Sequence, residues 1–90
     1  MEKLDAKFYG EIRKVKDDSL VPDDEYMVFL AKDNAFADMI FYYRDRCIAL
    51  GCDKEQIESI QRGIDRLLKW RGENLERCKN PDAAGEKLLG

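Results

Sequence analysis

The strongest concentration of side chains that could do chemistry is basic, and it lies in the second half of the chain. Residues 61–71 read Gln-Arg-Gly-Ile-Asp-Arg-Leu-Leu-Lys-Trp-Arg and hold four cations against one anion, Asp65. Arginine side chains bind phosphate or carboxylate oxygens through paired N–H groups, and aromatic rings can stack on a base. This segment therefore predicts a site for a small anionic ligand.

More side chains join this basic zone if the chain folds back at Gly51. Two antiparallel helices around that glycine would bring Arg44 and Arg46 beside Arg62. Two other interpretations stay open, a solvated helix face and a protein interface, because exposed ion pairs contribute little and such cations are usually hydrated. We expect the ligand-binding residues to be Arg44, Arg46, Arg62, Arg66, Lys69, Arg71, Tyr43 and Trp70.

The residue types argue against catalysis. The chain has no histidine, which is the commonest general base, and it contains no Ser/His/Asp arrangement or phosphate-cradling glycine loop. The cysteines Cys47, Cys52 and Cys78 lack the short spacing of zinc sites, and we expect them to be reduced and mainly packed. The sequence therefore predicts no enzyme activity, no catalytic residue, no metal and no cofactor.

The amino-acid composition of the chain limits the classes of partner that we expect it to bind. The net charge of −3 argues against general nucleic-acid binding and against binding to acidic membranes. No apolar run approaches the roughly 20 residues of a membrane span, and the N-terminus lacks the features of a signal peptide. We expect a cytoplasmic protein with one helical domain over residues 1–80 and a loose tail over 81–90.

Two helices joined at Gly51 would position the basic zone. Glycine can take the positive φ that ends a helix, and Asp53 is a strong N-cap with Gln56 as its capping-box partner. The sequence predicts a long antiparallel αα-hairpin over about 34–50 and 54–78.

The segment before the hairpin is expected to add one or two shorter helices, so the predicted fold class is all-α. An apolar stripe indicates a helix over residues 3–18, although alternating apolar residues leave a strand open. Pro22 and the acidic residues after it indicate a helix start. Whether residues 23–50 form one helix or two stays open.

The apolar residues of 26–50 cover about half of the circumference of a helix, which is more than one neighbouring helix can bury. Large exposed apolar patches are uncommon on monomers. We therefore predict a homo-oligomer that assembles through apolar faces, most simply a dimer joined through residues 26–43.

Two charged residues, Asp33 and Arg71, fall on the apolar stripes of the expected hairpin. A buried ion pair between them would set the register of the helices. Alternatively, Asp33 is the N-cap of a separate helix that begins at Asn34. The sequence supports both interpretations.

Residues 25–82 resemble small helical-hairpin proteins of bacteriophages and prophages. The matching residues are Tyr26 to Leu30, Asp33, Ala37, Tyr43, Gly51, Trp70 and Asn80-Pro81-Asp82. More loosely, Ile60-Gln61-Arg62-Gly63-Ile64 and Leu67 resemble the second hairpin helix of phage sponge proteins that sequester nucleotide immune signals. This resemblance implies an anti-defence protein in the host cytosol that binds a cyclic nucleotide or an NAD-derived signal.

Two functions are therefore expected. The first is a non-enzymatic homo-oligomeric binding protein for a small anionic nucleotide. The second is a protein–protein interaction module, an inhibitor or adaptor that docks on a host defence protein through the aromatic helix 26–50.

Overall fold

The computed structural model describes Leu4 and residues 7–81, and these divide into two compact units. The first unit contains the described residues up to Phe29, and the second is Leu30–Pro81. The expected C-terminal tail lies outside the described residues except for Pro81, and the single domain over 1–80 stays a prediction.

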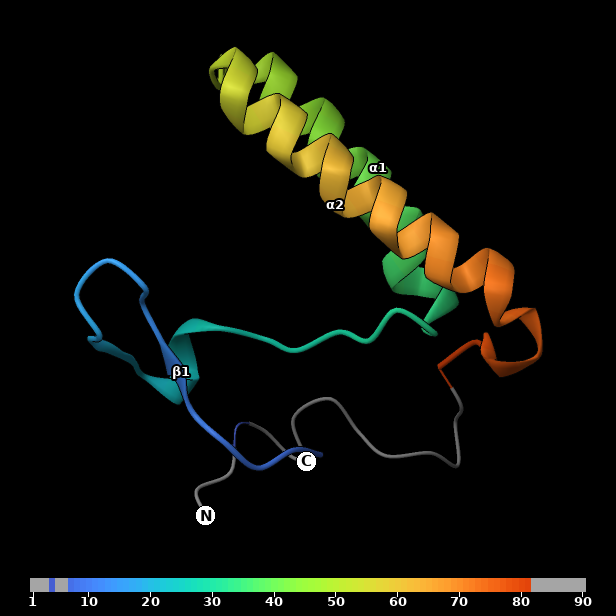
Figure 1. Ribbon diagram of the computed structural model, residues 1–90, viewed down its shortest axis with the longest axis horizontal. Helices are drawn as coiled ribbons and strands as arrows, with labels where there is room; N and C mark the ends of the chain where they lie inside the picture. The colour runs from blue at the N-terminus through green and yellow to red at the C-terminus, as the bar shows by residue number, and fades with distance from the viewer. Residues whose placement is uncertain (1–3, 5–6, 82–90) are drawn as a thin grey trace. The chain divides into compact units, whose positions relative to one another are not determined.

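The second unit is a helical hairpin (Figure 1). Helix α1 is Asn34–Ala49 and helix α2 is Lys54–Glu73, followed by the short 3₁₀ turn η2, Leu75–Arg77. The second helix ends earlier than predicted because Asn74 leaves the helical conformation and its side-chain amide donates to the Trp70 carbonyl (2.8 Å). The expected hairpin is present, with a shorter second helix.

The turn between the helices has the predicted conformation. Gly51 has φ +81°, and its N–H donates to the Ile48 carbonyl (3.1 Å). The Cys52 N–H donates to the Cys47 carbonyl (3.1 Å). These two bonds define a Schellman motif, which satisfies carbonyls at the end of α1. The Asp53 side chain then caps α2.

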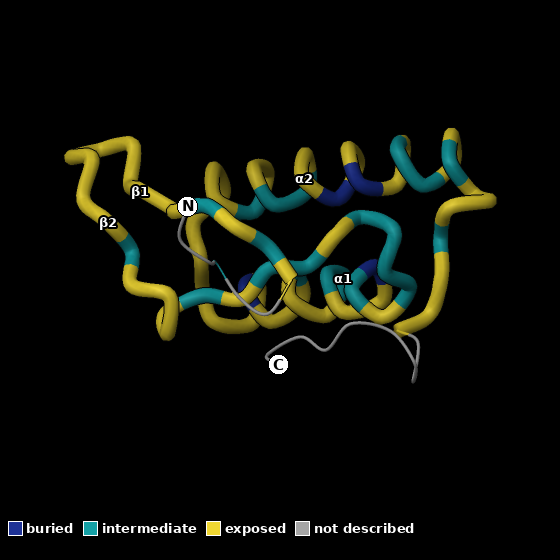
Figure 2. Tube along the Cα trace, turned by 90° about the horizontal axis from the view of Figure 1, so that it is seen from below, coloured by how far each residue is buried: buried dark blue, intermediate teal, exposed yellow. Residues whose placement is uncertain are grey.

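The core of the hairpin is a narrow seam between α1 and α2. Ile64 is fully buried, and Figure 2 shows the buried segments in both helices. A helix contacts its neighbour along one stripe, so the other sides of α1 and α2 stay accessible to solvent or to a partner. The buried apolar residues are Ala37, Cys47, Ile64 and Leu67.

Helix α1 begins at Asn34 because Asp33 caps it. The Asp33 carboxylate accepts hydrogen bonds from the Ala35 N–H (2.8 Å) and the Phe36 N–H (3.2 Å), which have no intrahelical partners. Residues 23–50 are therefore not one helix. Of the two interpretations of Asp33, the N-cap is correct.

The all-α prediction is wrong, because the first unit contains a two-stranded antiparallel sheet. Strand β1 is Ile12–Arg13 and strand β2 is Leu20–Val21. Before Phe29, the helical structure among the described residues is the single 3₁₀ turn η1, Asp23–Glu25, and the backbone is extended again at Tyr26. Of the two possibilities for residues 3–18, a helix and a strand, the strand is correct at β1.

Positive φ at Gly10 (+135°) interrupts the predicted helix within residues 7–18, and polar side chains then form a turn at its end. Asp18 adopts φ +60°, and the Asp17 carboxylate accepts hydrogen bonds from the N–H (3.0 Å) and hydroxyl (2.6 Å) of Ser19. These bonds hold the pKa of Asp17 below its usual value, with the hydroxyl as the larger cause. Short polar side chains that bond the nearby backbone favour turns over helices.

Replacing the cap of α1 is expected to destabilise the hairpin. Asp33→Ala should lower the free energy of unfolding by about 1 kcal/mol, because two N–H groups lose their acceptor. Asp33→Asn is the matched control, since asparagine caps about as well as aspartate. Urea denaturation followed by circular dichroism measures both variants. Equal losses for the two would contradict the capping role.

Candidate functional site

The structure spreads the predicted ligand-binding residues over four places instead of gathering them in one zone. A helix turns by about 100° per residue, so cations close in sequence point in different directions. Arg44 and Arg71 lie at the contact between the helices, Arg46 and Tyr43 are exposed on α1, Arg62, Arg66 and Lys69 are exposed on α2, and Trp70 is half-buried near the end of α2.

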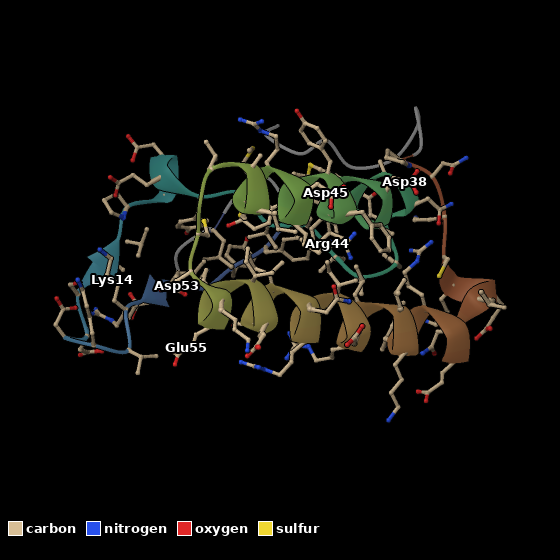
Figure 3. The ribbon with its side chains drawn as sticks, turned by 90° about the horizontal axis from the view of Figure 1, so that it is seen from above. Lys14, Asp38, Arg44, Asp45, Asp53 and Glu55 are labelled. Atoms are coloured by element: carbon tan, nitrogen blue, oxygen red, sulfur yellow. The ribbon has the colours of Figure 1, made fainter. Side chains whose placement is uncertain are left out.

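Arg44 is occupied by contacts between the helices (Figure 3). Its guanidinium donates to the Gln61 amide oxygen of α2 (3.0 Å) and pairs with Asp45 (3.3 Å). The Gln61 amide nitrogen in turn donates to Asp65 (2.9 Å). The Arg44 guanidinium also lies 5.6 Å from the Phe41 ring centroid. These contacts assign Arg44 to the packing of α1 on α2.

Arg71 connects α2 to the segment where α1 begins. Its guanidinium donates to the Ala31 carbonyl (2.9 Å) and to the Asn34 side-chain oxygen (2.5 Å). The Asp33 carboxylate instead accepts the N–H groups of α1, as described above. Arg71 therefore has the structural role that its place on an apolar stripe indicated, but with neutral acceptors.

The segment after η2 closes the base of the hairpin. The Lys79 N–H donates to the Lys32 carbonyl (2.9 Å), and Lys79 forms a parallel bridge with Asp33. The Asn34 side chain donates to the Asn80 side chain (2.8 Å). Sequence reasoning used Asn80 as part of the resemblance to the phage proteins. It missed these contacts because residues far apart in sequence make them.

Three cations form an exposed strip on α2. Arg62, Arg66 and Lys69 follow one another at helical spacing, on the side of α2 that points away from the buried Ile64. None of the three forms an ion pair with another described residue. We call these residues the basic strip of α2.

Trp70 is covered by another part of its own chain. The Arg77 guanidinium of η2 lies 5.2 Å from the centroid of the Trp70 ring, which is cation–π distance. The ring is half-buried. It lies beside the basic strip, since Trp70 follows Arg66 by four residues and is therefore only about 40° further around the helix.

The main exposed apolar surface of the hairpin is on α1, facing away from α2. Its large side chains are well exposed, with 67% for Tyr42, 51% for Tyr43 and 45% for Met39. Arg46 lies among them. The sequence predicted a wide apolar arc here, and α2 covers only part of it. We call this surface the outer face of α1; it consists of Ala35, Met39, Tyr42, Tyr43, Arg46 and Leu50.

Two carboxylates border the outer face of α1. Asp38 and Asp45 are seven residues apart and therefore lie on the same side of the helix, as their positions along α1 in Figure 3 show. Asp45 is paired with Arg44. Asp38 is exposed and forms no ion pair with another described residue.

Two thiols and a phenol meet where α1 ends. The Tyr43 side chain interacts with the Cys47 thiol, which raises the pKa of Tyr43 above its usual value. The pKa of the Cys52 thiol is also raised, first by partial desolvation and then by the Cys47 thiol. Cys47 is buried and Cys52 is exposed. Tyr43 and Cys47 are one helical turn apart, and the turn at Gly51 brings Cys52 back to Cys47.

The part of the chain that the structure describes contains no group of three or more His, Cys, Asp or Glu side chains placed to hold a metal ion. Neither of its helices is apolar over a stretch long enough to traverse a bilayer. Comparison of the chain with protein families, curated proteins and solved structures found no match.

Removing the Arg71 guanidinium is expected to loosen the base of the hairpin. Arg71→Met keeps the aliphatic stem but loses two charge-assisted hydrogen bonds, so the free energy of unfolding should fall by about 1.5–3 kcal/mol. Arg66→Met is the matched control on the exposed side of α2, and it should stay within about 0.5 kcal/mol of wild type. Denaturation with guanidinium chloride measures the free energy of unfolding of both variants. Equal values would show that the hydrogen bonds of Arg71 do not stabilise the hairpin.

Proposed function

We propose that the protein is a non-enzymatic interaction module that self-associates through the outer face of α1. The observation that carries this proposal is the exposure of large apolar side chains at helical spacing on a helix whose opposite side packs on α2. Tyrosine and methionine are enriched in protein interfaces. The absence of histidine from the chain supports a function without catalysis.

A second copy of the same helix fits this face in an antiparallel arrangement. The face runs from Ala35 to Leu50, so its midpoint lies between Tyr42 and Tyr43. A two-fold axis at that midpoint makes the contact self-complementary, as symmetric dimers require. It places Met39 opposite the charged Arg46 of the partner subunit, and the tyrosines of both copies in the centre.

Charge complementarity supports this arrangement. In the antiparallel dimer, Arg46 lies within one residue, about 1.5 Å along the axis, of the level of Asp38 of the partner subunit. Because Asp38 is at the edge of the face, the long Arg46 side chain can cross the apolar centre and reach it. The two-fold axis forms this ion pair twice.

Truncating the centre of the face is expected to produce monomers. Tyr42→Ser removes an exposed ring, so it should raise the Kd of the dimer about tenfold or more while leaving helical content unchanged. Leu75→Ser, which removes an exposed apolar side chain outside the face, is the control and should associate like wild type. Sedimentation equilibrium over micromolar concentrations measures both. A wild-type protein that is monomeric throughout would refute self-association.

Charge-reversal variants test the antiparallel arrangement of the two helices, whereas the preceding variants test only which surface of α1 forms the interface. Arg46→Asp places a carboxylate near Asp38 of the partner subunit, and Asp38→Arg places two cations together, so each should raise the Kd about tenfold. The double variant restores opposite charges and should return the Kd to within about twofold of wild type. If the single variants weaken the dimer and the double variant does not recover, the face is correct but the antiparallel register is wrong.

Anion binding is a second candidate function, and the basic strip of α2 supports it. Three cations without ion pairs to described residues occupy successive turns on one side of the helix. The resemblance to phage sponge proteins points to a nucleotide immune signal. The proposal now concerns Arg62, Arg66 and Lys69, since the contacts of Arg44 and Arg71 are structural.

A thermal-shift screen tests this second candidate. Cyclic dinucleotides, ADP-ribose and ATP are the probes, and a ligand at 100 times its Kd should stabilise the fold by about 2.7 kcal/mol. Arg66→Glu should abolish that stabilisation without changing the melting temperature of the free protein. The absence of any shift with all probes would leave the interaction module as the function.

A further inference from the structure

The Schellman motif at the end of α1 brings two thiols together. In this motif the third residue from the helix end and the second residue after the C-cap contact each other; with Leu50 as the C-cap of α1, these are Cys47 and Cys52. The Cys52 nitrogen lies 3.1 Å from the Cys47 carbonyl oxygen. With ordinary bond lengths, that distance keeps the two Cα atoms within about 7 Å of each other.

This separation allows a disulfide. Cysteines can be bridged without backbone movement when their Cα atoms lie within about 7 Å and their side chains point toward each other. The Cys47 thiol also contributes to the raised pKa of Cys52, as expected when the two sulfur atoms are neighbours. The third cysteine, Cys78, lies beyond the other end of α2, with its sulfur 3.5 Å from the Asn74 carbonyl oxygen.

The two thiols differ in a way that suits sequential oxidation. Cys52 is exposed and can meet a dissolved oxidant, whereas Cys47 is only 8% exposed. Oxidation of an exposed cysteine is reversible when a second thiol is close enough to condense with it. Cys47 would therefore resolve the oxidised form of Cys52 from the buried side.

We propose that Cys47 and Cys52 form a reversible intramolecular disulfide when the protein meets a hydroperoxide. The Cys52 thiolate attacks a peroxide oxygen and the O–O bond breaks, which leaves a sulfenic acid on Cys52 and a hydroxide that takes up the thiol proton. The Cys47 sulfur then attacks the Cys52 sulfur, the S–O bond breaks, and the hydroxyl leaves with the Cys47 proton as water. With hydrogen peroxide, two thiols lose two electrons and the peroxide becomes two waters.

Peptide mapping after oxidation tests this site in the full chain. Trypsin cleaves after Arg46 and Lys54, so residues 47–54 form one peptide that holds both cysteines. After hydrogen peroxide and then iodoacetamide, this peptide should lack two hydrogens and carry no alkyl group. Dithiothreitol should restore alkylation at both positions. Cys78 should be alkylated throughout.

A variant with the thiol moved by one residue is the matched control. Cys47→Ala combined with Ile48→Cys keeps nearly the same ring size but turns the thiol by about 100° around α1. In the folded state the step from the Cys52 sulfenic acid to the disulfide should be about tenfold slower than in wild type, because the two thiols are no longer held together. When both proteins are unfolded in guanidinium chloride, their disulfides should form at rates within about twofold of each other, since the loops to be closed are nearly equal in length.

Three results would overturn the inference. The first is equal rates for the folded wild type and the control variant, which would mean that the Schellman motif does not bring the thiols together. The second is accumulation of Cys52 sulfinic acid while Cys47 still reacts with iodoacetamide. The third is a disulfide between two copies as the main product on a non-reducing gel. Circular dichroism confirms that both proteins are folded before oxidation.

Discussion

The hairpin depends on the contact that Arg71 makes with the beginning of α1. Only four apolar residues are buried between the two helices. This small core does little to fix the register of α1 along α2. The Arg71 guanidinium supplies that constraint by binding the Ala31 carbonyl and the Asn34 side chain. Hydrogen bonds to a charged donor are stronger than those between neutral groups, and their geometry is specific. At the other end of the hairpin the Schellman motif and the Asp53 cap hold the turn.

The same arrangement determines which surfaces are left for binding. Because Arg44 and Arg71 are held by α1–α2 contacts, the cations that remain exposed on α2 lie on its far side. The two tyrosines of α1, Tyr42 and Tyr43, are exposed for a related reason, since α2 covers only one stripe of that helix. The hairpin therefore presents an apolar face on one helix and a basic strip on the other, and each proposed function uses one of them.

Features set by neighbouring residues were predictable from the sequence, and features set by distant residues were not. Gly51 and Asp53 determine the turn within a few residues. The position of the turn at Ala31 and the pairing of Lys79 with Lys32 depend on contacts between residues that are far apart in the hairpin sequence. The candidate site failed for a geometric reason. Arg62 and Arg71 are about two and a half helical turns apart, so they point in opposite directions although a linear reading places them together.

The bridge between Lys79 and the segment at Lys32 and Asp33 has a consequence for protein engineering. It brings together the two points at which the chain enters and leaves the hairpin, within hydrogen-bonding distance of each other. A structural element whose ends are adjacent can be inserted into a surface loop of an unrelated protein without stretching that loop. Residues 30–81 therefore have the geometry of a transplantable cassette that would carry both exposed helix faces to a new scaffold.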